Sequence, residues 1–368
     1  MKKFLDCISV VGSTPSRFQG TKKYVSTGAV ATTEIDESEV VEVSYEDRPS
    51  RANLTAEAGD ILFAKMQGTR KTLLLDSETE ENIYSTGFYA VRANPEIITT
   101  ECLYYLVDSE LFLAQKDKNC SGATQKAITN GGLAKIEIRI PPLSEQAVLT
   151  EKLRYLTQLI ADRKKQLELF DEVIKSRFIE MFGDPKYNHK GYAKQQLKET
   201  CRVITGNTPS RAVSEYYGDD IEWIKTDNIV EGILYPTTAT ESLSPKGMEV
   251  GRTVEKDSIL MACIAGSLSS IGRVCVTDRK VAFNQQINAI EPIKYNTLFL
   301  YVMLQLSKEY LIEEINMALK GILSKSKLEE KIFIVPPMDL QQQFAAFVKQ
   351  TDKSKYHGES SYEMEVAA

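Results

Sequence analysis

The longest regular pattern in the sequence is a run of apolar residues separated by alternating steps of four and three. These steps average 3.5 residues, the period of the apolar seam along a coiled-coil helix. One interruption occurs, at Arg163. The pattern predicts a long helix over residues 144–184, and leaves open an amphipathic helix packed on one domain. Its seam positions are Leu149, Leu153, Leu156, Ile160, Leu167, Phe170, Ile174, Phe178 and Met181.

The segments around this helix mix β and α patterns. Short apolar runs at residues 40–43, 61–64 and 273–276 are bounded by Gly, Asn or Pro and predict strands. Longer stretches at residues 101–116 and 298–317 predict helices. The chain has 368 residues, more than one domain usually contains. We therefore expect an α+β fold with more than one domain.

An internal repeat divides the chain into two modules. Residues 12–17 (GSTPSR) recur as residues 206–211 (GNTPSR), 194 positions later. Three further matches follow in the same order, at offsets of 198, 194 and 195: residues 61–64 with 259–262, 126–128 with 320–322, and 141–146 with 336–341. Ordered matches at a nearly constant offset indicate a duplication. We predict repeated domains over residues 1–143 and 185–338.

A second, shorter helix is expected after the second module. Each module ends at a proline pair, which stops a strand and redirects the chain. After the second pair the seam spacing returns at Leu340, Phe344 and Phe347, which predicts a helix over residues 339–356. Later seam positions would be polar or glycine, so we expect this helix to be truncated and residues 357–368 to be a disordered tail.

Composition and charge restrict the function. The chain carries 45 Lys and Arg against 51 Asp and Glu, so no strong positive field draws it to nucleic acid or membrane. It has no run of 18 apolar residues, and Asp6 interrupts its N-terminus before a signal peptide could form. We therefore expect a cytoplasmic protein. Six cysteines without a C-x-x-C pair, and two histidines, predict free buried thiols and no metal site.

Motifs for catalysis are also missing from the sequence. It contains no phosphate-binding G-x-x-x-x-G-K-[ST] loop, no Asn-Pro-Pro-aromatic motif and no glycine-rich dinucleotide motif. Residues 329–331 have an acid-x-Lys spacing, but no catalytic Asp on a nearby strand accompanies it. We expect no catalysis from this chain. A solitary nuclease or deaminase-like enzyme stays open as an unfavoured alternative, and so does a tandem protein-interaction module.

Several motifs together resemble the specificity subunit of Type I restriction-modification enzymes. They are the Gly-x-Thr-Pro-Ser turns, the helix start at residues 141–146, the helix end at residues 175–185, and residues 24–30, 122–126 and 283–289. The resemblance covers residues 1 to about 355. It implies two α/β-type target recognition domains, each followed by a helix and each reading one half of a bipartite site in double-stranded DNA.

The resemblance also implies the partners and their cofactors. The two helices would pair as an antiparallel coiled coil and dock two methyltransferase subunits, which would carry S-adenosylmethionine. Motor-nuclease subunits would join through the methyltransferases and carry ATP and Mg. This chain itself would hold no cofactor. Because its modules are not basic, we expect it to bind DNA weakly without those partners.

Candidate DNA contacts lie in polar loops, because base edges and phosphates are bound by hydrogen-bonding and cationic side chains. The alternatives are turns, buried amides and solvated surface residues. We expect Arg70 and Lys71 to contact phosphates and Thr124 and Gln125 to read bases. The first-module candidates are Ser13, Thr14, Ser16, Arg17, Lys22, Lys23, Tyr24, Gln67, Thr69, Arg70, Lys71, Thr124, Gln125 and Lys126. Those of the second are Ser210, Arg211, Lys225, Thr226, Asn228, Ser267, Ser269, Asn284, Gln285, Gln286 and Lys320.

The expected mismatch in helix length leaves part of the seam without a partner. We predict that the seam between Leu167 and Met181, including Phe170, Ile174 and Phe178, is uncovered within the chain. A methyltransferase subunit, a helix of another polypeptide or a second copy of this chain would then cover it, because such apolar surface is rarely left in water.

Overall fold

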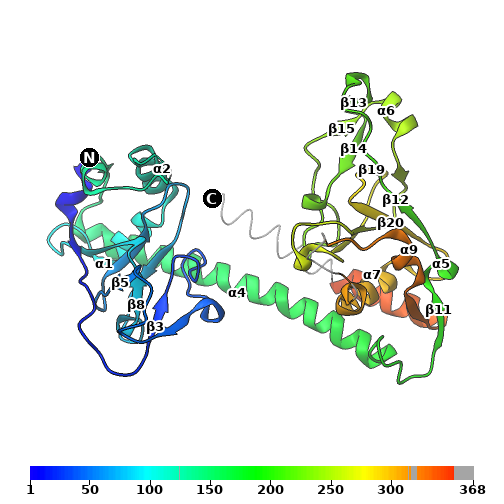
Figure 1. Cartoon of the computed structure of the whole chain (residues 1–368), viewed down its shortest axis with the longest axis horizontal. Coiled ribbons are helices and arrows are strands. Elements are labelled where there is room, and N and C mark those ends of the chain that lie inside the picture. Colours follow the sequence, from blue (N-terminus) through cyan, green and yellow to red (C-terminus); the bar gives the residue numbers. More distant parts are fainter. Residues whose placement is uncertain (124, 314, 316–320, 352–368) are drawn as a thin grey trace. The chain divides into compact units, whose positions relative to one another are not determined.

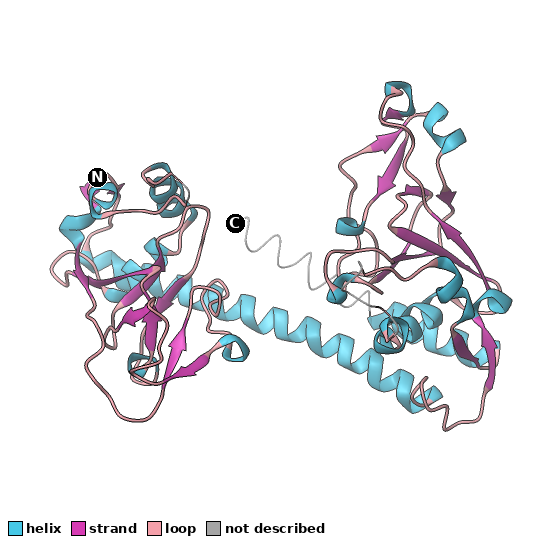
Figure 2. Cartoon of the chain, in the orientation of Figure 1, coloured by secondary structure: helices cyan, strands magenta, loops and turns pink. Residues whose placement is uncertain are grey.

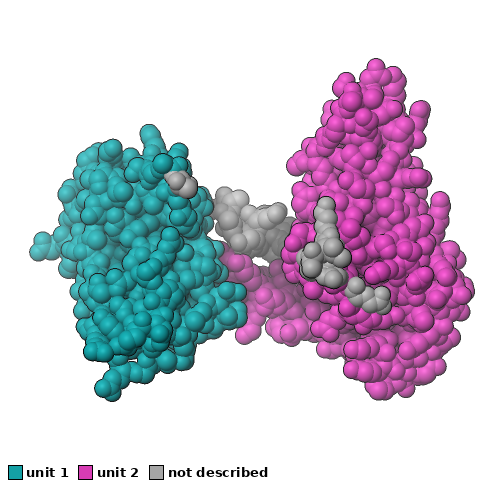
Figure 3. All heavy atoms as spheres, in the orientation of Figure 1, with its two compact units in different colours: residues 1–159 teal, residues 160–368 magenta. Residues whose placement is uncertain are grey.

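The computed structural model describes residues 1–123, 125–313, 315 and 321–351. The chain divides into two compact units, residues 1–159 and 160–368 (Figures 1 and 3). Helix α4 (Leu143–Phe182) contributes its first part to the first unit and the rest to the second. Both units contain helices and sheets (Figure 2), which confirms the predicted α+β class.

The first unit contains two four-stranded sheets and one short strand pair. One sheet is antiparallel, with the order β2 (Ile8–Val11), β9 (Phe88–Ala93), β6 (Ile61–Ala64), β7 (Thr72–Leu74). The other has the order β4 (Val41–Val43), β3 (Lys22–Val25), β8 (Ile83–Ser85), β5 (Ala52–Leu54), with β3 and β8 parallel. Strand β1 (Lys2–Lys3) pairs with β10 (Glu137–Ile138).

The second unit repeats this topology, with one additional edge strand in its mixed sheet. Its antiparallel sheet has the order β12 (Cys201–Thr205), β20 (Ile287–Pro292), β17 (Ile259–Ala262), β18 (Val274–Val276). Its mixed sheet has the order β13 (Tyr217–Gly218), β15 (Ser242–Leu243), β14 (Ile221–Ile224), β19 (Val281–Phe283), β16 (Thr253–Val254), with β14 and β19 parallel. Strand β11 (Ala193–Gln196) pairs with β21 (Ile332–Val335). The matching strand orders confirm the duplication.

The helices occupy corresponding places in the two halves of the chain. The first unit has α1 (Thr100–Val107), α2 (Glu110–Lys118) and α3 (Asn130–Leu133), with 3-10 turns at Phe4–Cys7, Glu37–Glu39 and Thr79–Glu81. The second has α5 (Leu197–Thr200), α6 (Pro245–Val250), α7 (Thr297–Leu306), α8 (Lys308–Ile312) and α9 (Lys325–Glu330), with 3-10 turns at Ser214–Tyr216, Thr226–Asn228 and Leu268–Ser270. Residues 338–351 are also helical.

The repeated segment at residues 61–64 and 259–262 is a strand buried on both faces. In β6, Ile61 and Phe63 pack into the cluster that includes α1 and α2, whereas Leu62 and Ala64 pack into a cluster with residues of the mixed sheet. Strand β17 divides its four side chains in the same way. Because side chains alternate along a strand, an unbroken apolar run is what a sheet between two layers requires.

The C-terminal part of α4 is covered by the second helix and by α7. Phe178 is fully buried, and its ring lies 5.4 Å from that of Phe344 and 5.3 Å from that of Phe299. Farther along the second helix, Val348 lines a cavity with Ile174. The later residue of α4, Phe178, contacts the earlier residue of the second helix, Phe344, whereas the earlier Ile174 lies near the later Val348. The two helices therefore pair antiparallel.

This packing corrects the predicted position of the open seam. Ile174 and Phe178 were expected to be uncovered within the chain, but both are buried in the core of the second unit. The seam residues that stay exposed lie near the other end of α4, where Leu149 is 41% and Leu156 is 40% exposed. The expectation failed because heptad spacing does not show which end of a long helix a shorter one covers. Residues 352–368, and so the predicted tail, lie outside the described part.

Candidate nucleic-acid interface

The repeated Thr-Pro-Ser motif forms an exposed loop after the first strand of the antiparallel sheet in each unit. In the first unit, Ser13, Thr14, Ser16 and Arg17 are exposed, while Pro15 is buried. Ser13 shares a hydrogen bond of 3.1 Å with the hydroxyl of Thr55. The motif therefore anchors through its proline and presents hydroxyls and a guanidinium to solvent, the groups that phosphate or base contacts require.

The initial glycine of this motif is explained by a close backbone approach in the second unit. A Cβ on Gly206 would lie 2.1 Å from the carbonyl oxygen of Asn284. In addition, Thr208 donates a hydrogen bond to Gln285. The structure thus places the predicted loop at residues 206–211 against the predicted loop at residues 284–286, which are far apart in the sequence.

Two aromatic residues of the second unit hold this loop in place. The indole Nε1 of Trp223 donates to the carbonyl of Asn207 at 3.3 Å, and the Tyr217 hydroxyl donates to that of Pro209 at 2.7 Å. The guanidinium of Arg211 lies over both rings, 4.7 Å from the Tyr217 centroid and 5.3 Å from that of Trp223. Cation–π contacts of this kind orient an arginine without hiding its edge from solvent.

The loop at residues 67–71 is fixed by a buried lysine that the sequence did not indicate. Lys116 donates from Nζ to the carbonyls of Met66 at 2.7 Å and Thr69 at 2.9 Å. Asp117 accepts from the amide of Gly68 at 2.9 Å. These contacts close the loop onto α2, and Gln67 donates from its side chain to the Asp117 carbonyl.

Arg70 and Lys71 do not have the free side chains that were expected for phosphate contacts. Arg70 pairs with Asp108 at 2.7 Å and with Glu110 at 3.2 Å. The ammonium of Lys71 donates to the carbonyl of Thr27 at 2.6 Å. Both cations fasten the loop to neighbouring elements, and phosphate contact by either one stays a prediction.

Three predicted DNA contacts are buried and have structural roles. Tyr24 is 8% exposed and packs with Val43 and Ile83. The Asn228 side chain accepts from the amide of Lys225 and donates to the Thr238 carbonyl. Asn284 accepts from the amide of Gln286 and donates to its side chain. The side-chain amides of the two asparagines bind loop backbone, which was the open alternative for Asn284, and DNA contact by these three residues stays a prediction.

The other predicted residues lie on the surface or near it. Lys22 pairs with Glu81 at 3.1 Å and Lys23 with Glu37 at 2.8 Å, while Gln125 donates to the Met66 sulfur. Ser267 shares hydrogen bonds with Ser269 and Ser270. Thr124 and Lys320 lie outside the described residues. Lys126 and Ser210 are exposed, and Thr69, Thr226 and Gln286 are half-buried; DNA contact by these five residues stays a prediction.

Two glutamates belong to the site but were missed. Arg17 pairs with Glu46 at 2.8 Å, and Arg211 pairs with Glu241 at 2.6 Å. The separation along the chain is similar, 29 residues from Arg17 to Glu46 and 30 from Arg211 to Glu241, but the repeat alone does not align the two glutamates, because they border corresponding strands at opposite ends.

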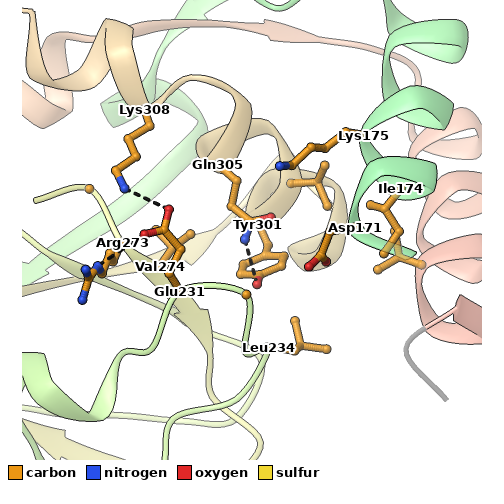
Figure 4. Close-up of a pocket in the computed structure, with 14 residues that line it drawn as sticks. Asp171, Ile174, Lys175, Glu231, Leu234, Arg273, Val274, Tyr301, Gln305 and Lys308 are labelled. Carbon is orange, nitrogen blue, oxygen red and sulfur yellow. Dashed lines mark hydrogen bonds and ion pairs between the residues drawn. The ribbon is translucent and has the colours of Figure 1, made fainter. Parts of the chain in front are cut away.

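A cavity of about 300 Å³ lies elsewhere in the second unit (Figure 4). It is bordered by α4, α7, β18 and the second helix, and Glu231 on its wall pairs with Lys308 at 3.0 Å and with Arg273 at 3.6 Å. Within the described residues, none of the candidate DNA contacts lines it. This cavity is therefore a feature of the helix packing and separate from the candidate interface.

The described residues offer neither a metal site nor a membrane span. They contain no cluster of three or more His, Cys, Asp or Glu side chains placed to hold a metal ion. Across the same residues, no helix has the length and apolar character needed to span a membrane.

This chain is similar to specificity subunits of Type I restriction enzymes. The specificity subunit of the HindI Type I restriction enzyme from Haemophilus influenzae is 23% identical and aligns 77% of this chain with 76% of its own. The MjaIX specificity subunit from Methanocaldococcus jannaschii is 24% identical, with coverage of 72% and 68%.

Solved structures show the same fold. The S subunit of a Type I restriction-modification system from M. genitalium has a TM-score of 0.56 at 12% identity, and it covers all of this chain and 92% of its own. A chain from a study of assembly and conformational transition in a Type I system has a TM-score of 0.55 at 19% identity, covering all of this chain and 93% of its own. The sequence profile of the Type I restriction modification DNA specificity domain matches residues 12–169 and again residues 189–360. The chain belongs to this family.

Proposed function

We propose that this chain is the DNA-recognition and assembly subunit of a Type I restriction-modification complex, with each module reading one half of a bipartite site. The observation that carries this proposal is the duplication. Each half of the chain matches the DNA specificity domain and presents its own Thr-Pro-Ser-Arg loop after equivalent strands. The family supplies recognition and not catalysis, so the chain is a non-catalytic subunit.

The partners follow from this role. Methylation and cleavage would come from two methyltransferase subunits with S-adenosylmethionine and from motor-nuclease subunits with ATP and Mg. The exposed apolar residues of α4, Val148, Leu149, Tyr155 and Leu156, support a methyltransferase or another helix as the molecule that covers this helix. A cytoplasmic location fits, since the proposed DNA target and partners are found there.

Methylome sequencing tests this function. Cells that express the chain with its methyltransferase subunits should carry adenine methylation at one motif made of two short half-sites and an unspecified spacer. Cells with an empty vector in place of this chain, but with the same methyltransferase subunits, are the control. A methylome that is identical with and without the chain would contradict the proposal.

A further inference from the structure

In both units the arginine that ends the Thr-Pro-Ser-Arg motif pairs with a glutamate beside the mixed sheet. Arg17 pairs with Glu46 across 29 residues, and Arg211 pairs with Glu241 across 30. The two glutamates border corresponding strands of the mixed sheets at opposite ends, since Glu46 follows β4 and Glu241 precedes β15. Exposed ion pairs contribute only about 0–1 kcal/mol to stability. A repeated surface pair with so little effect on folding suggests a role in binding.

In the second unit, one carboxylate holds two cations. One oxygen of Glu241 contacts Arg211 at 2.6 Å, and the other accepts from the ammonium of Lys225. The main chain of Glu241 is fixed, because its carbonyl accepts from the amide of Trp223 at 3.0 Å. The Arg211 side chain is nevertheless 58% exposed. An incoming molecule can therefore reach the guanidinium without unfolding the loop.

The charge of this cluster favours an anionic ligand. Hydrogen bonds from Arg211 and Lys225 lower the pKa of Glu241 to about 2, so the carboxylate is ionised at neutral pH. Two cations and one anion leave a net charge of +1. A phosphate diester presents two oxygens to a guanidinium much as a carboxylate does, and arginine binds both in the same planar geometry.

We propose that Glu46 and Glu241 are electrostatic latches: each occupies the position beside its arginine that a DNA phosphate takes when the duplex binds. This inference rests on the proposed DNA-recognition function. Each latch lowers the affinity for arbitrary DNA, because a duplex must displace a carboxylate before the arginine can contact a phosphate. The displaced carboxylate then takes up a cation from solution, which offsets part of the counterion release on binding.

Glu46→Gln and Glu241→Gln test the latch in the full chain assembled with its methyltransferase subunits. The probe is a fluorescent duplex of random sequence, titrated between about 50 and about 200 mM salt. Each variant should bind about 3- to 10-fold more tightly at the lower salt, and its salt dependence should steepen by about 0.9 in slope. Adding Arg211→Gln to Glu241→Gln should remove most of the gain.

Matched controls separate the latch from a change in overall charge. Glu137→Gln and Glu291→Gln remove the same charge from the ion pairs with Lys3 and Arg202, which lie away from the motif loops. These controls should bind like the wild type. An equal gain in the controls, or weaker binding by Glu241→Gln with unchanged thermal unfolding, would overturn the latch while leaving DNA recognition intact. If no form binds DNA, the proposed function fails and the latch fails with it.

Discussion

Two buried glutamines at equivalent positions in the repeat attach a helix to each unit. Gln146 accepts from the amide of Thr99 at 2.8 Å and donates to the carbonyls of Ile97 and Pro141. Gln341 accepts from the amide of Asn296 at 2.9 Å and donates to the carbonyl of Pro336 at 2.8 Å. The sequence showed that these glutamines repeat, but not that each one closes the same set of backbone groups.

Replacing Gln341 with alanine should destabilise the second unit. The change leaves the Asn296 amide and the Pro336 carbonyl without partners in a buried place, which costs on the order of 3 kcal/mol. Unfolding in urea, followed by circular dichroism, measures the loss. The exposed Gln343 on the same helix provides the control, and Gln343→Ala should have little effect. Equal losses in the two variants would show that the hydrogen bonds of Gln341 have no special role.

The buried cysteines should make the stability of the fold depend on pH in the alkaline range. All six are free, as predicted, and burial raises the pKa of Cys201, Cys263 and Cys275 to about 12 from 9.0. In the unfolded chain these thiols ionise near pH 9. The folded state keeps its protons up to about pH 12, so stability from this source is full below pH 9 and falls as pH rises between the two values.

Thermal unfolding at a series of pH values checks this sign. These thiols should leave the unfolding temperature nearly unchanged below pH 9. Above pH 9, the unfolding temperature should fall as pH rises. In the native protein at pH 9, alkylation by iodoacetamide should be slow at all three and faster at the half-buried Cys120. Rapid alkylation of Cys263 without unfolding would contradict the assigned burial.

At the scale of elements, the strands of the repeat were more predictable than the helix pairing. The local pattern predicts strands at residues 61–64 and 259–262, and each is a strand that is buried on both faces of its sheet. Which part of α4 is covered depends on where α7 and the second helix pack. The spacing of apolar residues along the sequence gives no information on that packing. Burial of Tyr24 and Asn228 was missed for the same reason, since the partners of polar groups come from distant segments.

Phe178→Ala should be among the most damaging substitutions on α4. Its ring packs between Phe299 and Phe344, so truncation leaves a cavity and should cost about 3–5 kcal/mol of unfolding free energy. Ile179 on the same helix is exposed, and Ile179→Ala should cost far less. Urea unfolding compares the two. A small loss for Phe178→Ala would mean that α4 does not pack on the second unit as described.

At the scale of the whole molecule, the chain binds DNA in this account without being basic. Residues 1–140 hold 16 Lys and Arg against 20 Asp and Glu, and residues 185–335 hold 19 against 18. The structure adds that many candidate cations, including Arg17, Lys23 and Arg211, are paired with carboxylates. Affinity for DNA of arbitrary sequence should therefore be low. Recognition should depend on loops whose cations leave these carboxylates and bind DNA instead.

The central claim is that each module reads its own half of the DNA site, and exchanging one module tests it most directly. Residues 1–140 are replaced by the corresponding module of a relative, and the methylomes of cells expressing either chain with its methyltransferase subunits are sequenced. The account predicts that one half of the methylated motif changes while the other half is kept. A motif that changes in both halves, or in neither, would contradict it.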